Sequence, residues 1–393
     1  MKSLYKHINK NCCGHSLYEN LINVRKLSKE DHDKLVALDR LYAEYNFHYR
    51  KDYDRTALKN LDEEREKFLS ARKAGVKYFP KFEGYPCNIS EGILKMGEEL
   101  IAAFYDLDCF LSKYYIECIK IRQIRMKYFM GLVPPTQYMQ VQKQTPSLEN
   151  YYKALQIIKE HPFEEIDESD RDIDAKTAQK LIQAHIDKLG YKWKVKISDR
   201  VIPRMSVSPD QYMKIRTDAT FSKDDIEGLK VHEIEGHIGR RYYGLKTGLY
   251  LFLFGMNWCN DLDEGLAVWN SINKVKNVKP NVYPNIALKT VIAYQLDKMD
   301  FCELFDFCHE LVPKMPLDKL FEALARFKRE VTDCSIKGGN GDDRSYFNGY
   351  LMVDEMTDEE RDDILKWNVG PGQLNDLPEI KKFFELNKFE PLI

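Results

Sequence analysis

Residues 231–240 read VHEIEGHIGR, a stretch that concentrates side chains able to bind a metal ion. His232 and His237 supply two imidazoles, and Glu233 supplies a carboxylate directly after the first. Two neutral imidazoles suit a metal of borderline softness such as Zn²⁺. On a regular α-helix, residues five apart point about 140° away from each other, so both rings reach one ion only if the helix is irregular. We expect a π-bulge between the histidines, which Gly236 would ease. The alternative is a solvated face of an amphipathic helix.

A second motif lies downstream, where residues 259–269 read CNDLDEGLAVW and an acidic segment opens a helical pattern. Glu264 lies in the range where zinc peptidases of the gluzincin type take their third ligand, on the helix after the two histidines. The same carboxylate has a competing interpretation. Asp261 and Glu264 are three residues apart, so they could instead form a capping box at the start of this helix.

A third segment, together with the first two, resembles the motifs of one protein family. Residues 328–333 read KREVTD, and residues 343–349 read DRSYFNG after a glycine-rich loop that we expect to be flexible. In this order, the H-E-I-x-x-H, D-E-G-L-A, K-R-x-x-T-D and D-x-x-Y-x-x-G motifs resemble those of the tyrosine carboxypeptidase family. Its eukaryotic members remove the C-terminal tyrosine of tubulin, and many bacterial members are known by a QEGLA motif. The resemblance covers about residues 200–350.

Three departures from the family's pattern stand out. Glu330 occupies the position of a glycine after the arginine, and Asp342 occupies the position of a lysine. Glu235 and Gly236 replace the usual glycine and threonine of the first motif. These departures bear on substrate preference more than on metal binding.

The resemblance implies a zinc metallocarboxypeptidase of the HExxxH type. His232, His237 and Glu264 would hold Zn²⁺ and leave a fourth position for water. Glu233 would be the general base that takes a proton from this water and passes it to the leaving amine. Tyr346 is the candidate oxyanion donor, because its phenol is a neutral hydrogen-bond donor.

An exopeptidase also needs a cation for the terminal carboxylate of its substrate. Arg329 suits this role, since a guanidinium binds a carboxylate bidentately. Lys328 and Arg240 are weaker candidates for substrate binding. The alternative for these side chains is ordinary surface charge.

The substrate would be the C-terminus of a peptide or protein, and the residue removed could be aromatic. A tubulin-like partner follows from kinship alone. Two other functions stay open. One is a metal-binding regulatory protein without useful peptidase activity, although every presumed ligand and the presumed base are present. The other is a zinc endopeptidase, which would also cleave peptides with a blocked C-terminus.

Composition argues against several classes of partner. The chain has 60 Lys and Arg against 62 Asp and Glu, so no net field favours nucleic acid or an anionic membrane. The longest apolar run, residues 248–258, is too short to cross a bilayer. The nine cysteines form no C-x-x-C pair, and the N-terminus lacks an apolar signal segment. We therefore expect a cytoplasmic protein with free thiols.

The predicted fold class is α+β and predominantly helical. Residues 1–27 are a weakly patterned lead-in, and residues 28–165 form an N-terminal helical region with one long helix over residues 90–130. Residues 170–393 form a zincin-like metallopeptidase domain after an acidic linker.

Alternating apolar residues between 193 and 216 predict three short strands, a small sheet that precedes the metal-binding helix. An edge strand of this sheet could hold a peptide substrate by β-augmentation. Ser222 and Asp225 predict a capping box where the metal-binding helix begins.

Overall fold

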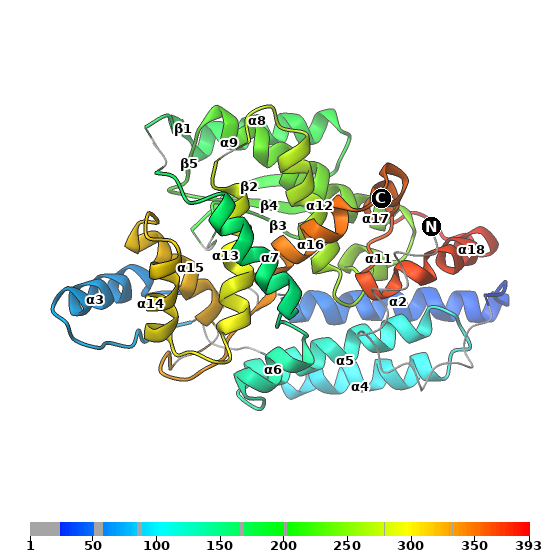
Figure 1. Cartoon of the computed structure of the whole chain (residues 1–393). Helices are drawn as coiled ribbons and strands as arrows, with labels where there is room; N and C mark the ends of the chain where they lie inside the picture. Colours follow the sequence, from blue (N-terminus) through cyan, green and yellow to red (C-terminus); the bar gives the residue numbers. More distant parts are fainter. Residues whose placement is uncertain are drawn as a thin grey trace.

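The computed structural model confirms an α+β class that is predominantly helical (Figure 1). The predicted lead-in over residues 1–27 lies outside the described residues except for its last four, 24–27. The structure describes residues 24–50, 58–84, 89–165, 169–199, 201, 203–278, 280–329, 331 and 333–393.

The N-terminal region is helical, as predicted, but the prediction of one long helix over residues 90–130 is wrong. A turn at residues 106–111 divides residues 90–130 into two helices that pack against each other. Leu107 and Leu111 in this turn are both buried, so the apolar spacing continues through it and conceals the break. The helices of this region are α2 (Lys29–Arg50), α3 (Leu61–Lys73), α4 (Glu91–Tyr105), α5 (Ser112–Phe129), α6 (Pro135–Val141) and α7 (Leu148–Glu160).

The three predicted strands form one sheet, in the order β2-β4-β3. β2 (Lys194–Ser198) runs parallel to the central strand β4 (Tyr212–Arg216), and β3 (Met205–Val207) pairs with it antiparallel. A second small sheet pairs β1 (Ile173–Asp174) with β5 (Thr220–Phe221), and α8 (Ala175–Lys188) packs on β2. β3 is therefore an edge strand.

The predicted capping box is present. The Ser222 side chain accepts a hydrogen bond from the backbone of Asp225, and the Asp225 carboxylate accepts one from the backbone of Ser222. It starts α9 (Lys223–Leu229), which continues without a break through the π-helix η2 (Lys230–Ile238) into α10 (Gly239–Lys246). One long helical segment therefore follows the sheet and begins at this cap, and the two histidines lie in the middle of it.

Helices make up most of the remaining chain, and α12 packs against both η2 and α16. The elements are α11 (Tyr250–Phe254), α12 (Asn260–Asn273), α13 (Val282–Gln295), α14 (Phe301–Leu311), α15 (Leu317–Lys328), η3 (Asp342–Arg344), α16 (Ser345–Asp354), α17 (Asp358–Lys366), η4 (Pro371–Asp376) and α18 (Leu377–Leu386).

Two hydrophobic cores hold these elements together. One includes buried residues of α2, α4, α5, the β2-β4-β3 sheet, η2, α11 and α18, and the other joins α3 and α7 to α13, α14 and α15. Helices from the first 165 residues therefore bury apolar surface in both cores, and α2, α4 and α5 lie along one side of the molecule (Figure 1). The division into domains near residue 165 stays a prediction.

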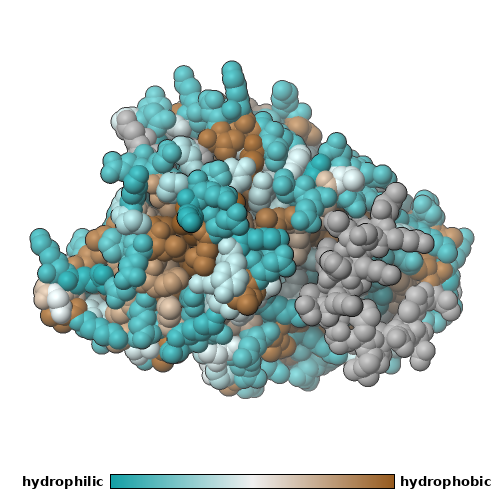
Figure 2. Space-filling model, in the orientation of Figure 1, coloured by the Kyte–Doolittle hydropathy of each residue, from teal (hydrophilic) through white to brown (hydrophobic). Residues whose placement is uncertain are grey.

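Much of the face in Figure 2 is hydrophilic, with apolar areas between the hydrophilic side chains. Among the helices that the structure describes, none combines the length and the apolar character needed to cross a bilayer.

Candidate metal centre and cleft

The helix between the two histidines is irregular, as the spacing predicts. Residues Lys230–Ile238 are π-helical, and the backbone N–H of Gly239 donates to the carbonyl of Ile234, five residues earlier. This pattern turns residues five apart towards the same side, and the ring centroids of His232 and His237 are 5.2 Å apart. The predicted departure from α-helical geometry is confirmed.

Gly236 contributes through close packing. A Cβ at this position would lie 3.1 Å from the Cβ of Ala267 and 3.2 Å from its Cα. That is tighter than side chains normally pack, so α12 can lie this close to η2 only because residue 236 has no side chain. The close approach brings the carboxylate of Glu264, on α12, over the two imidazoles.

Glu264 points at the histidines and does not cap its helix. Its Oε2 atom lies 3.9 Å from His232 Nε2 and 3.6 Å from His237 Nε2. The helix begins after Cys259 with no side-chain cap, and Asp261 instead forms an ion pair with Arg344 at 2.9 Å. The capping-box interpretation of Asp261 and Glu264 is therefore wrong.

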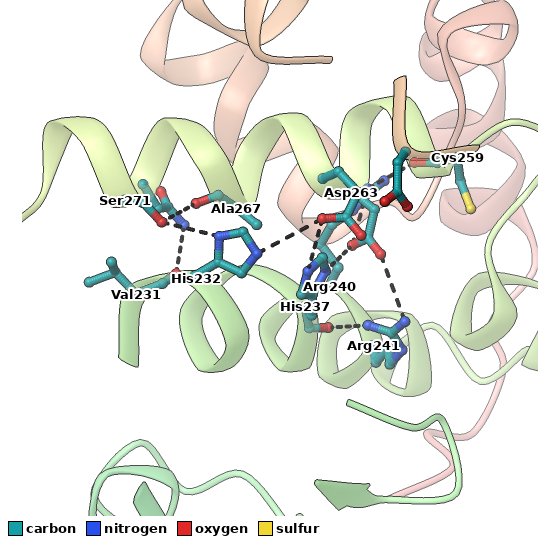
Figure 3. A network of polar contacts seen from close by, with 12 residues as sticks. Val231, His232, His237, Arg240, Arg241, Cys259, Asp263, Ala267 and Ser271 are labelled. Carbon is teal, nitrogen blue, oxygen red and sulfur yellow. Dashed lines mark hydrogen bonds and ion pairs between the residues drawn. The ribbon is translucent and has the colours of Figure 1, made fainter. Parts of the chain in front are cut away.

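Both histidines are oriented by a partner on α12 (Figure 3). Ser271 Oγ lies 3.1 Å from His232 Nδ1, and the Ser271 hydroxyl donates its only proton to the carbonyl of Ala267 at 3.0 Å. Ser271 must therefore accept from Nδ1–H, which leaves His232 Nε2 unprotonated. Asp263 Oδ1 lies 3.1 Å from His237 Nδ1, an ion-pair distance on the side of the ring away from Glu264. Sequence analysis missed both partners.

The electrostatics of this cluster fit a bound cation. Burial and, to a smaller extent, the neighbouring His237 lower the pKa of His232 to about 4. Burial also disfavours protonation of His237, but Asp263 and Glu264 together hold its pKa well above the ordinary value. The Oε2 atom of Glu264 is buried and has no hydrogen-bond partner in the described part of the chain.

Two imidazole nitrogens and a carboxylate oxygen thus converge, and the ligand atoms of His232, His237 and Glu264 lie within 4.8 Å of one another. The Oε2 atom of Glu264 lies 3.6 Å from His237 Nε2 and makes no hydrogen bond with a described residue, so a metal ion bound between them would compensate a buried charged oxygen. The donor set, the hydrogen bond between His232 and Ser271 and the Asp263 carboxylate beside His237 are features of a histidine–carboxylate metal site. These three residues could hold a metal ion.

A cavity of about 880 Å³ opens beside this cluster. Glu233 lines it, and burial raises the pKa of its carboxyl to about 7. The N-terminal helices supply part of the wall through Phe47 of α2 and the arginines Arg122 and Arg125 of α5. The N-terminal region therefore forms part of the cleft wall, a role that no motif in these residues predicts.

The predicted cations divide into two groups. Arg329 lines the cavity, and its buried Nε has no hydrogen-bond partner among the described residues. Lys328 is buried and donates from Nζ to the carbonyls of Ile336 and Gly338, both at 2.7 Å. Lys328 thus anchors the glycine-rich loop, which we expected to be flexible, and does not line the cavity.

Arg240 also makes its polar contacts with other parts of the protein and not with the cavity. Its side chain is fully buried, donates to the carbonyl of Val369 at 3.0 Å and lies 3.5 Å from Asp263. Its neighbour Arg241 lines the cavity instead. We therefore do not retain Lys328 or Arg240 as substrate-binding residues, because burial and existing partners remove both from the cleft.

Tyr346 lies in the first turn of α16 and lines the cavity together with Glu233 and Glu264. A second arginine that sequence analysis missed, Arg326, lines it too and forms an ion pair with Asp343 at 2.9 Å. Arg326 lies one helical turn before Arg329, and this spacing is the feature of the sequence that predicts both arginines on one face of the helix.

The fold and the cleft define a helical α+β protein with a candidate metal centre. A model of the microtubule-associated tyrosine carboxypeptidase family matches residues 134–391. The chain belongs to this family, which confirms the resemblance drawn from its motifs and extends it to α6 and α7 at one end and α18 at the other. A carboxypeptidase-like function follows from membership. A comparison with curated proteins finds no match.

Proposed function

We propose that this chain is a zinc-dependent carboxypeptidase that removes the C-terminal residue of a peptide or protein. The observation that carries the proposal is the convergence of His232, His237 and Glu264 beside Glu233 in one cleft. Two independent findings support metal-dependent hydrolysis of a peptide bond: the chain belongs to a family of carboxypeptidases, and its three-ligand site has an adjacent carboxylate.

Zn²⁺ held by these three residues would supply Lewis-acid chemistry, polarising the scissile carbonyl and lowering the pKa of water. Glu233 accepts a proton from the attacking water and later delivers it to the leaving amine. A carboxyl whose pKa is raised to about 7 by burial suits both halves of this task, since it exchanges a proton readily near neutral pH.

Arg329 binds the terminal carboxylate of the substrate. Its guanidinium lines the cavity, and its buried Nε has no hydrogen-bond partner in the described part of the chain, so a substrate carboxylate is a well-matched ligand for it. Arg326 differs because Asp343 already neutralises it. Arg329 is therefore the cation of this pair that we assign to substrate binding.

The edge strand β3 offers backbone groups to an extended peptide. Arg216 N–H donates to the Arg204 carbonyl, and Ser208 N–H donates to the Tyr212 carbonyl, so even-numbered residues here face β4. The intervening Met205 and Val207 then direct their N–H and C=O groups to the open edge. Both residues line the cavity, which places this edge beside the cleft.

Tyr346 donates its phenol hydrogen to the oxyanion that forms from the scissile carbonyl. Burial raises the pKa of this phenol well above its ordinary value, and Glu264 raises it further, so Tyr346 stays a neutral donor at the pH of catalysis. A donor aimed at developing charge acts mainly in the transition state.

The name of the family connects its members with microtubules and with a C-terminal tyrosine. We therefore propose an aromatic C-terminal residue as the preferred leaving group and a tubulin-like protein as a candidate partner, by kinship only. We also propose a cytoplasmic location. The described cysteines are free thiols, as in a reducing compartment.

A peptide library digested by the zinc-loaded protein and read by mass spectrometry tests this function. We expect loss of one C-terminal residue from free-acid peptides, abolished by a chelator and restored by Zn²⁺. Internal cleavage would establish an endopeptidase instead. No cleavage together with retained zinc would establish the metal-binding regulatory protein.

A further inference from the structure

A lysine lies against the ring of Tyr346 from outside the cleft. Lys289 Nζ, on α13, is 3.2 Å from the centroid of the Tyr346 ring. The Lys289 side chain has no hydrogen bond or ion pair with any residue that the structure describes. The aromatic face therefore takes the place that a carboxylate usually has beside a half-buried ammonium.

The surrounding helices hold this contact in place. α13 packs against both η3 and α16, and Thr290 donates to the carbonyl of Arg344 at 3.5 Å. Burial lowers the pKa of Lys289 to about 8, while Asp343 opposes this shift, so the side chain is cationic at neutral pH. The positive charge and the ring are therefore fixed by separate elements, one on each side of the contact.

We propose that Lys289 is a positioning residue for Tyr346: its ammonium fixes the ring and polarises the phenol, so that the O–H donates more strongly to the oxyanion. A cation over an aromatic face is attracted by the ring quadrupole and withdraws electron density from the ring. A more acidic phenol is a stronger donor to developing negative charge. The inference rests on the proposed function, because it concerns the same reaction.

A purely structural cation–π contact is the competing explanation, and the chain contains a matched example. Lys298 Nζ lies 3.2 Å from the centroid of the Tyr294 ring, the same distance as in the Lys289 pair. Tyr294 stacks on Tyr151 and does not line the cavity. Lys298→Met therefore removes the same kind of contact without touching the cleft.

A double-mutant cycle on the full-length, zinc-loaded enzyme tests the proposal. We expect Lys289→Met to lower kcat about tenfold with KM changed less than about twofold, and Lys289→Arg to retain most of the activity. In a Tyr346→Phe background, which keeps the ring but not the hydroxyl, Lys289→Met should have no further effect on kcat. Lys298→Met should leave kcat unchanged. Multiplicative effects of Lys289→Met and Tyr346→Phe would overturn the proposal.

A second measurement does not depend on activity. The tyrosine analogue 2,3,5-trifluorotyrosine, which has a more acidic phenol, is placed at position 346, and its ionisation is followed by fluorine NMR. Lys289→Met should raise the midpoint by about one pH unit, and Lys298→Met should not move it. An unchanged midpoint in Lys289→Met would also overturn the proposal. If the unmodified enzyme cleaves no peptide, the proposed function fails, and this midpoint alone decides whether Lys289 acts on Tyr346.

Discussion

Gly265 and Gly349 touch at the crossing of α12 and α16. A Cβ on Gly265 would lie 2.7 Å from the Cα of Gly349, and a Cβ on Gly349 would lie 2.9 Å from the Cα of Gly265. No side chain fits between these backbones. Glu264 directly precedes Gly265, and Tyr346 lies three residues before Gly349, so this contact brings both side chains to the same cleft. The glycines of the second and third motifs therefore have a physical role in assembling the site.

Gly349→Ala tests this role. The added methyl group must push α12 and α16 apart, which should lower the free energy of unfolding by roughly 1–3 kcal/mol and also reduce zinc affinity. Gly228→Ala is the matched control, because it adds the same methyl group to helix α9 with no atom within 4 Å. Thermal unfolding and zinc titration measure both effects. Equal behaviour of the two variants would contradict the close-crossing account.

Glu264→Gln separates a ligand from a structural carboxylate. An amide is a poorer ligand than a carboxylate, so we expect zinc affinity to fall at least tenfold, by about 1.4 kcal/mol or more. Zinc content after dialysis against a competing chelator measures this change. Full zinc retention by the variant would remove Glu264 from the site.

Asp263→Asn tests the orientation of His237. The amide no longer attracts the Nδ1–H as a carboxylate does, and such outer partners typically change metal affinity about 10- to 100-fold. Asp218→Asn is the control, because this exposed carboxylate pairs with Arg216 away from the cluster. A variant with unchanged zinc affinity would show that Asp263 serves only its neighbours Arg240 and Arg241.

Glu233→Gln should separate metal binding from catalysis. We expect the variant to keep its zinc and to lose roughly 10²- to 10⁴-fold in kcat, because the general base is gone while the ligands remain. Glu235→Gln changes the next carboxylate of the same π-helix, which pairs with His185 and Lys274, both at 3.5 Å, and should stay active. Comparable activity losses in the two variants would argue against Glu233 as the base.

Local signals were enough to predict much of the fold and the metal cluster. The spacing of His232 and His237 requires an irregular helix if both rings are to reach one ion, and the Ser222 capping box marks where the helical segment begins. Both features depend on residues close together in the chain, so the sequence expresses them directly.

Features that depend on tertiary packing could not be predicted in the same way. Lys328, Arg329 and Arg240 look equivalent as charged residues, yet packing buries two of them and exposes one to the cleft. Asp263 directly precedes Glu264 in the sequence, but its contact with His237 depends on the close approach of α12 to η2. The cleft wall formed by α2 and α5 consists of segments that precede the metal cluster by more than one hundred residues in the chain.

Arg329→Gln tests whether the cleft recognises a free C-terminus. Loss of one partner of a buried charge pair typically costs about 2–5 kcal/mol, so the preference for free-acid over amidated peptides should fall well over tenfold. Arg72→Gln is the control, because Arg72 pairs with Asp306 outside the cavity. An unchanged preference in Arg329→Gln would assign the carboxylate to another cation.

The most direct measurement of the central claim compares two peptides that differ only at the C-terminus, one a free acid and one an amide. With the unmodified, zinc-loaded enzyme, kcat/KM for loss of the C-terminal residue should be at least tenfold higher for the free acid, and a chelator should abolish the cleavage. Equal cleavage of the two peptides, or cleavage that survives full removal of zinc, would contradict the account of a zinc-dependent carboxypeptidase.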